Sequence, residues 1–209
     1  LPSLPEQERI AEILVGWDTA IQKTEQLIAA KDRHFAATSH LLLTSRKRLN
    51  GFSTQWGLRR ADGIFESTSR KGHLNEPLLS VTQERGVIPR DTLEGRVTMP
   101  SGETGAFKLV EPGNFVISLR SFQGGLEHTS YRGLVSPAYT VLREVAEIDQ
   151  RFFRHYFKSA NFVKRLSVAV IGIRDGKQIS FQDFCSIKLP FPSVDEQKAI
   201  GALLDEVEG

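Results

Sequence analysis

Residues 2–14 read PSLPEQERIAEIL and residues 192–204 read PSVDEQKAIGALL, so one phrase occurs near both ends of the chain. In each copy a proline-containing segment leads into Glu-Gln and then into an apolar helical pattern. The offset of 190 residues is too long for the unit of a stacked-repeat protein. The repeat therefore predicts that the same helix start follows each of two large modules in a longer parent protein. This chain would hold one complete helix, one module and the beginning of the next helix.

The first copy opens a pattern that predicts one long helix, from about residue 5 to about residue 45. A proline in the first turn and the acidic Glu6 and Glu8 suit a helix N-terminus, and Asn50-Gly51 is a stop signal. Apolar residues recur at the spacing of about 3.5 residues that is typical of a coiled-coil seam. A helix of about 40 residues is roughly 60 Å long, so one small domain cannot cover it. We therefore expect the seam to contact another subunit through Ile10, Leu14, Trp17, Ile21, Ile28, Phe35 and Leu42.

The middle of the chain has a different residue pattern, because short apolar runs are broken by glycine and proline. These runs predict strands over residues 78–82, 95–99, 115–119, 134–136, 139–142 and 186–189. The apolar spacing predicts one helix over 149–166, whose aromatic residues pack in the core, and a short helix over 181–184 that begins after Ser180.

The expected fold class is α+β. A long coiled-coil-type helix over residues 1–50 precedes a globular mixed α/β domain with an irregular sheet over residues 51–188. Residues 189–209 form the start of a second helix, which would be marginal on its own.

Composition places the protein among ordinary globular proteins, because 40% of the 209 residues are apolar and 25% are charged. The lone Cys185 excludes an intrachain disulfide and fits a reducing, cytoplasmic compartment. We expect Cys185 to be buried and inert. No apolar run approaches the roughly 18–20 residues that span a bilayer, and no signal-peptide pattern is present, so we expect no membrane segment.

The basic charge is concentrated in the middle segment, where residues 51–188 carry 19 basic and 14 acidic side chains. Arginine can bond bidentately to guanine and glutamine to adenine, while other basic contacts reach phosphates. Any single residue of this kind is more simply a solvated surface charge, but turn-rich stretches are where recognition residues gather. The candidate DNA-contacting residues are Arg70, Lys71, Arg85, Arg90, Arg96, Arg120, Gln123, Arg132, Arg174, Lys177 and Gln178.

Motifs for metal, nucleotide or nucleophilic chemistry are absent from the sequence. The histidines are scattered, no Cys-x-x-Cys or His-Glu-x-x-His occurs, and no glycine-rich phosphate loop follows a strand. We therefore expect no metal, no cofactor and no catalytic residue.

One tetrapeptide, Ser136-Pro137-Ala138-Tyr139, resembles the Asn/Asp-Pro-Pro-Tyr/Phe signature of amino-group DNA methyltransferases, which act on a flipped base. Serine and alanine replace two of its residues, and the glycine-rich motif expected for S-adenosylmethionine is missing. A stand-alone adenine DNA methyltransferase is therefore the enzymatic alternative, and the tetrapeptide is more simply a structural phrase.

Several phrases resemble the specificity subunit of Type I restriction-modification enzymes, and together they cover nearly the whole chain. The ends contribute the Leu-Pro…Glu-Gln helix start and its second copy. The matching stretches are residues 1–7, 10–14, 17–18, 41–44, 47–49, 79–82, 86–88, 135–139, 187–190 and 196–197.

The resemblance implies an arrangement and a function. In that family two target-recognition domains are separated and followed by conserved helices, which pack as an antiparallel coiled coil, and each domain reads one half of a split DNA sequence. Modification subunits clasp the helices and methylate adenine, and a restriction subunit adds a nuclease. Residues 1–50 would be the conserved spacer helix, 51–188 one target-recognition domain, and 189–209 the start of the next conserved helix.

The expected protein is thus a non-catalytic DNA-recognition module whose partners are double-stranded DNA, modification subunits and a restriction subunit. Two copies pairing through their long helices would restore a two-domain arrangement. A third possibility is a decoy that occupies modification subunits without touching DNA.

Overall fold

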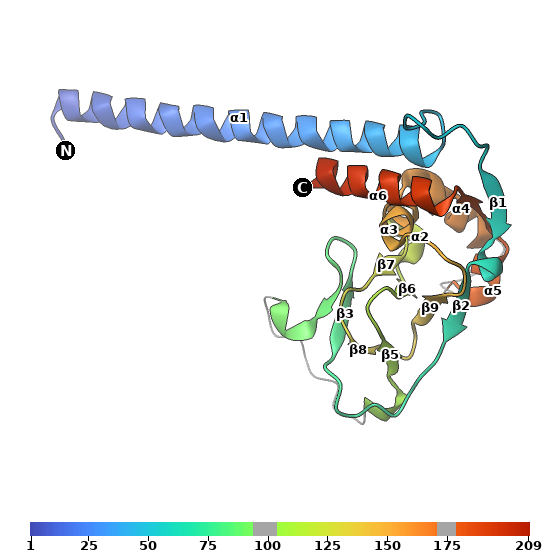
Figure 1. Ribbon diagram of the computed structural model, residues 1–209. Helices are drawn as coiled ribbons and strands as arrows, with labels where there is room; N and C mark the ends of the chain where they lie inside the picture. Colours follow the sequence, from blue (N-terminus) through green and yellow to red (C-terminus); the bar gives the residue numbers. More distant parts are fainter. Residues whose placement is uncertain (94–103, 171–178) are drawn as a thin grey trace.

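A long helical rod projects from a body of strands and shorter helices in this computed structural model (Figure 1). The structure describes residues 1–93, 104–170 and 179–209. The rod is α1 (Leu4–Leu43), a helix of 40 residues whose N-terminal part extends well beyond the body (Figure 1). Its bounds confirm the predicted long helix. Pro5 lies in the first turn, where its missing N–H costs nothing, and Gln7 Nε2 donates back to the Pro2 carbonyl at 2.8 Å.

The body is built on a four-stranded antiparallel sheet with smaller strand pairs around it. The sheet has the order β2 (Phe65–Thr68), β9 (Thr140–Glu144), β6 (Phe115–Ile117) and β7 (Glu127–His128). The antiparallel pairs are β1 (Gly57–Arg60) with β10 (Lys188–Phe191), β3 (Leu79–Thr82) with β4 (Gly86–Pro89), and β5 (Lys108–Val110) with β8 (Gly133–Val135). This arrangement confirms the predicted α+β class with an irregular sheet.

The predicted strands are found where the apolar runs are strongest. Observed strands match the predictions over 78–82, 115–119, 134–136 and 139–142, and β10 overlaps the one over 186–189. The predicted strand over 95–99 lies outside the described residues. The division at residues 50/51 and 188/189 stays a prediction, and β10 crosses the second of these boundaries.

Short helices connect and cover the strands. They are η1 (Ala61–Gly63), η2 (Arg90–Thr92), η3 (Thr104–Ala106), α2 (Ser121–Gly124), α3 (Gln150–Lys158), α4 (Ala160–Val170), α5 (Phe181–Cys185) and α6 (Val194–Glu208). The prediction of one helix over 149–166 is wrong, because Ser159 is extended between α3 and α4. Its hydroxyl donates to the Tyr156 carbonyl at 2.7 Å and accepts from the Phe162 amide at 3.3 Å, so it caps both helices. The short helix after Ser180 is confirmed, with a capping box to Asp183.

Aromatic side chains form the centre of the body. Phe157 is fully buried and its ring lies 5.0 Å from that of Phe115 and 4.8 Å from that of Phe162, between centroids. Phe65, on β2, adds further edge-on contacts. The aromatic residues of α3 therefore pack in the core, as predicted. Cys185 is buried, also as predicted, and burial raises the pKa of its thiol.

The second copy of the repeated phrase joins the rod to the body. Arg48 donates from Nε and Nη2 to the two carboxylate oxygens of Glu196, each at 2.7 Å, and Trp56 Nε1 adds a bond at 3.0 Å. Glu196 is only 1% exposed. Gln197 Nε2 donates to the Pro192 carbonyl at 2.9 Å, the same bond that Gln7 makes in the first copy. From this junction α6 runs back beside the last part of α1 (Figure 1).

The apolar seam of α1 is divided between the body and solvent. Toward the free end it is exposed, with fractions of 66% for Trp17 and 53% for Ile21. Leu42 is a correction to the predicted subunit contact, because it is buried at 3% in the chain's own core. Phe35 is also partly buried against that core, since the body packs beside the end of α1. In the described parts of the chain, no helix combines the length and apolar character needed to cross a bilayer.

Candidate functional site

Two predicted recognition residues, Arg85 and Arg120, line one hollow of about 590 Å³ on the body. Arg85 lies in the turn between β3 and β4, and Arg120 lies between β6 and α2. Gln83, Leu119 and Tyr139 also line the hollow. Both arginines are exposed, and no ion-pair partner for either is found among the described residues. The hollow therefore presents guanidinium groups together with an amide, a phenol ring and the carboxylates of Glu84 and Glu127.

The β3–β4 turn is held in one conformation by its own side chains and by the strand beneath. Thr82 Oγ1 donates to the Gly86 carbonyl at 2.9 Å and accepts from the Arg85 amide at 3.1 Å. Gly86 has φ of +70°, and a Cβ there would lie 2.8 Å from the His128 carbonyl oxygen. Only glycine fits this position. The turn therefore sits directly on β7 while Arg85 faces solvent.

The second side of the hollow is the tight segment that contains α2. Ser121 Oγ accepts from the Ser118 amide at 2.8 Å, and the Gly125 amide donates to the Ser121 carbonyl at 2.9 Å. Gly125 has φ of +80°, and a Cβ there would lie 1.9 Å from the Phe157 carbonyl oxygen. This segment packs closely on α3, and Arg120 is exposed. Gln123, a third predicted residue, is exposed on the same segment but does not line the hollow.

A buried ion pair lies beneath both segments. Glu127, on β7, is 1% exposed and accepts from Lys158 Nζ at 2.6 Å. Burial raises the pKa of the Glu127 carboxyl to about 7, against the opposing effect of Lys158. Its second oxygen has no hydrogen-bond partner among the described residues. Glu127 also lines a cavity of about 560 Å³ between α1 and the body, together with His128, whose pKa is lowered by burial.

Replacing Glu127 by glutamine is expected to remove a pH dependence of stability. Because the pKa of Glu127 is higher in the folded protein than its ordinary value of 4.5, the folded state binds the proton more tightly than the unfolded chain does. The wild-type free energy of unfolding should therefore fall as pH rises from about 4.5 to about 7, by up to roughly 3 kcal/mol.

Urea denaturation between pH 4.5 and 8 checks this expectation. The stability of E127Q relative to wild type should rise with pH, whereas Glu84→Gln, at an exposed position in the neighbouring turn, should follow the wild-type curve. Parallel curves for E127Q and wild type would contradict it.

A second group of predicted residues forms a network of surface ion pairs away from the hollow. Arg132 donates to Glu76 at 2.8 Å and to Glu111 at 2.6 Å, and Arg70 also pairs with Glu111. The Arg70 guanidinium, ahead of Arg132, lowers the pKa of Glu111. Acidic partners therefore balance the positive charges of Arg70 and Arg132 on this part of the surface. Lys71, next to Arg70, is exposed.

The remaining predicted DNA-contacting residues are dispersed. Arg90 is partly buried in η2, where its Nε and Nη1 have no hydrogen-bond partner in the described part of the chain. The others lie outside the described residues, namely Arg96, Arg174, Lys177 and Gln178. The structure thus brings Arg85 and Arg120 together, and Gln123 lies on the same segment as Arg120.

The tetrapeptide that resembles a methyltransferase signature is a turn before β9. The Tyr139 amide donates to the Ser136 carbonyl at 3.1 Å, and Ser136 Oγ accepts from the Ala138 amide at 3.3 Å. The serine hydroxyl is thus part of the turn, and Tyr139 contributes to the wall of the hollow.

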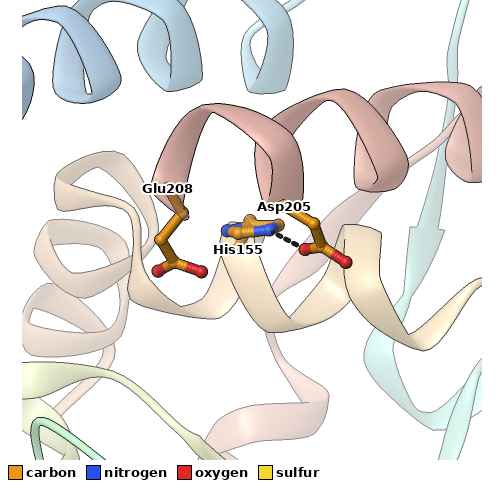
Figure 2. Close-up of side chains that lie close together, drawn as sticks. All are labelled: His155, Asp205 and Glu208. Carbon is orange, nitrogen blue, oxygen red and sulfur yellow. Dashed lines mark hydrogen bonds and ion pairs between the residues drawn. The ribbon is translucent and has the colours of Figure 1, made fainter.

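One polar cluster joins α3 to α6 (Figure 2). His155 Nε2 lies 2.7 Å from Asp205 Oδ1, and Glu208 follows on the next turn of α6. Arg154 Nη2 contacts Asp205 at 2.7 Å and Glu208 at 2.8 Å. Burial lowers the pKa of His155, and Asp205 opposes this shift. Because Arg154 already supplies positive charge to both carboxylates, we interpret the cluster as a helix clamp rather than a metal site.

Sequence reasoning did not identify Glu127, Lys158 or the Arg154 cluster. Their partners lie on elements distant in the chain, and neither spacing nor composition marks such pairs. Glu127 lies in the polar stretch Gly-Gly-Leu-Glu-His-Thr-Ser, where nothing in the local sequence marks a buried carboxylate.

Comparisons with known proteins show which solved structures share this fold. No family model matches the chain. The HsdS subunit from Thermoanaerobacter tengcongensis is similar over 100% of this chain and 52% of its own, with a TM-score of 0.56 and 17% identity. The Type I restriction-modification system S subunit from M. genitalium is similar over 99% of this chain and 55% of its own, with a TM-score of 0.60 and 16% identity.

A chain of a type I R-M system, solved in work on its complex assembly and conformational transition, matches over 100% of this chain and 53% of its own, with a TM-score of 0.53 and 16% identity. This chain therefore spans about half the length of the solved structures it matches. Over that half, it has the fold of the S subunits of Type I restriction-modification systems.

Proposed function

We propose that this chain is a non-catalytic DNA-recognition module of a Type I restriction-modification system, which reads one half of a split double-stranded target. The observation that carries the proposal is the fold shared with S subunits over the whole chain. The hollow supports it, because exposed Arg85 and Arg120 line it from two rigid segments. Such a module works in the cytoplasm, where chromosomal DNA is accessible.

The arginines at the hollow are the proposed base-reading residues, since a guanidinium fork matches the major-groove edge of guanine. Arg70, Lys71, Arg90 and Arg132 would contact phosphates, which position the duplex without reading sequence. The predicted residues beyond the described ranges belong to the same proposal, namely Arg96, Arg174, Lys177 and Gln178.

The exposed seam of α1 is the proposed docking surface for modification subunits, and through them for a restriction subunit. A second copy of the chain is the other proposed occupant of the seam. A symmetric pair would place two bodies at the ends of the rods and would read a split palindrome.

Alanine substitution of Arg85 or Arg120 is expected to weaken sequence-specific binding about tenfold or more each, because a bidentate arginine–guanine contact contributes roughly 1–3 kcal/mol of discrimination. The measurement is a fluorescence titration of the complex with modification subunits. Its probes are a duplex carrying the sequence that this complex methylates, read from the methylome, and a scrambled duplex. Lys164→Ala removes the same charge from the exposed face of α4 and should change binding less than about twofold.

Equal affinities of wild type and both arginine variants for the methylated sequence would exclude the hollow as the reading site. Failure of the wild-type complex to bind either duplex at low salt would overturn the proposed function and favour a decoy of modification subunits. Specific binding should also weaken steeply with salt, because phosphate contacts release counterions.

A further inference from the structure

Lys158, the last residue of α3, connects the segments that form the hollow. Its Nζ donates to the Gln83 carbonyl at 2.8 Å, to the Gly124 carbonyl at 3.1 Å and to Glu127 Oε1 at 2.6 Å. An ammonium group has three donors, so every donor of Lys158 is engaged. The side chain is 33% exposed, whereas its acid partner is 1% exposed.

The acceptors belong to the two segments that carry the proposed base-reading residues. Gln83 is in the turn that presents Arg85, and Gly124 ends the helix that follows Arg120. The two segments also touch each other directly, because Gln83 Nε2 donates to the Arg120 carbonyl at 3.4 Å. These contacts reach backbone carbonyls, so they fix the path of the chain rather than the rotamer of one side chain.

The positive charge of the ammonium strengthens each of these bonds. Two carbonyl oxygens and one carboxylate oxygen converge on it, and charge-assisted bonds of this kind are roughly twice as strong as neutral ones. Glu127 reaches the same point from β7, below the turn, so three elements meet at one atom of α3.

We propose that Lys158 is a positioning residue for DNA recognition, which holds the β3–β4 turn and the α2 segment at the separation at which Arg85 and Arg120 reach the same stretch of duplex. The inference rests on the proposed function. Lys158 itself need not touch DNA, since its ammonium is directed at protein acceptors. Without it, the two arginines keep their charge but lose their fixed spacing. Preorganised binding groups lose affinity when their supporting contacts are removed.

Lys158→Met tests this role in the complex with modification subunits, because methionine keeps the apolar stem and removes the three donors. The probes are the methylated-sequence duplex and the scrambled duplex of equal length. We expect affinity for the specific duplex to fall about tenfold and affinity for the scrambled duplex to change less than about twofold. Lys158→Arg, which restores a charged donor, should recover specific affinity to within about threefold. Lys164→Met removes the same charge elsewhere and should leave the ratio of the two affinities unchanged.

Hydrogen exchange of the free protein supplies a second readout. In Lys158→Met, amide exchange should accelerate in residues 79–89 and 118–126 and stay unchanged in the core helices. If Lys158→Met does not fold, Gly124→Ala replaces it, since the new Cβ would lie 2.8 Å from Gln83 Nε2 and displace the side chain that joins the turn to the Arg120 carbonyl. That variant should lower the ratio of specific to scrambled affinity in the same direction.

The outcomes separate the two proposals. If the wild-type complex binds and Lys158→Met keeps the same ratio of specific to scrambled affinity, the positioning role alone is overturned. Absence of binding by the wild-type complex would overturn the proposed function and the positioning role with it.

Discussion

Replacing Arg48 by alanine is expected to lower the free energy of unfolding by about 3–5 kcal/mol, because it leaves a buried carboxylate without its cation. Glu196 is 1% exposed, and both its oxygens are bound by Arg48 at 2.7 Å. After the substitution only the Trp56 indole would remain as a partner for that side chain among the described residues. Thermal and urea denaturation of the purified protein measure the loss.

Two controls separate the ion pair from the removal of any charge. Arg46→Ala removes a neighbouring exposed arginine and should change stability by less than about 0.5 kcal/mol. Glu6→Ala removes the counterpart of Glu196 in the first copy of the phrase, which is exposed, and should be equally silent. A loss below about 1 kcal/mol in Arg48→Ala would mean that the junction does not hold the rod to the body.

Aspartate at both Trp17 and Ile21 is expected to abolish binding through the α1 seam, with a loss of about 100-fold or more in affinity. The two side chains are exposed at 66% and 53% on the free part of the rod. Large apolar residues at the centre of a helical interface are its strongest contributors, and burying two carboxylates there adds a desolvation cost. Titration with modification subunits measures association with the first proposed occupant of the seam, and sedimentation of the isolated chain measures association with the second, another copy of the chain.

The matched control places the same charges on the opposite face of the same helix. Thr19→Asp with Gln26→Asp should leave both association reactions within about twofold of wild type. Neither double variant should change the stability of the monomer much, because all four positions are exposed. Association that survives aspartate at Trp17 and Ile21 would show that partners use another surface.

The long helix was predictable because its seam repeats over many turns without proline, and such a signal survives any tertiary context. Leu42 marks the limit of that reasoning. A seam residue looks the same in sequence whether its partner helix comes from the same chain or from another, so the pattern cannot tell α6 from a second subunit. The break at Ser159 was missed for a related reason: the apolar period continues across it, and only the serine's double capping role ends α3.

Short strands were predictable where the apolar runs were clear. They were not predictable where a segment is a strand only because it pairs with a distant one. β1 reads GLRR and is exposed at every position, so nothing local marks it as a strand. Its partner β10 lies at the other end of the body sequence. The same distance hides the site. Arg85 and Arg120 were chosen for residue type and loop context, but their common hollow forms where two segments distant in the chain meet. Arg70 and Arg132 were chosen on the same grounds, and sequence did not disclose that Glu111 and Glu76 sit beside them.

Among the described residues, the body contacts the rod toward its C-terminal end, and this makes the rod a cantilever. About 31 residues of α1, at positions 4–34, precede Phe35, where the helix begins to pack against the core, and they span roughly 45 Å at the rise of a helix. A tilt of about 5° at the Arg48–Glu196 junction would therefore displace the free tip by about 4 Å, more than the rise of one base pair of DNA. The stiffness of this attachment, which combines the Arg48–Glu196 junction with the packing of Phe35 and Leu42, sets how accurately anything bound at the tip is spaced from the base-reading face.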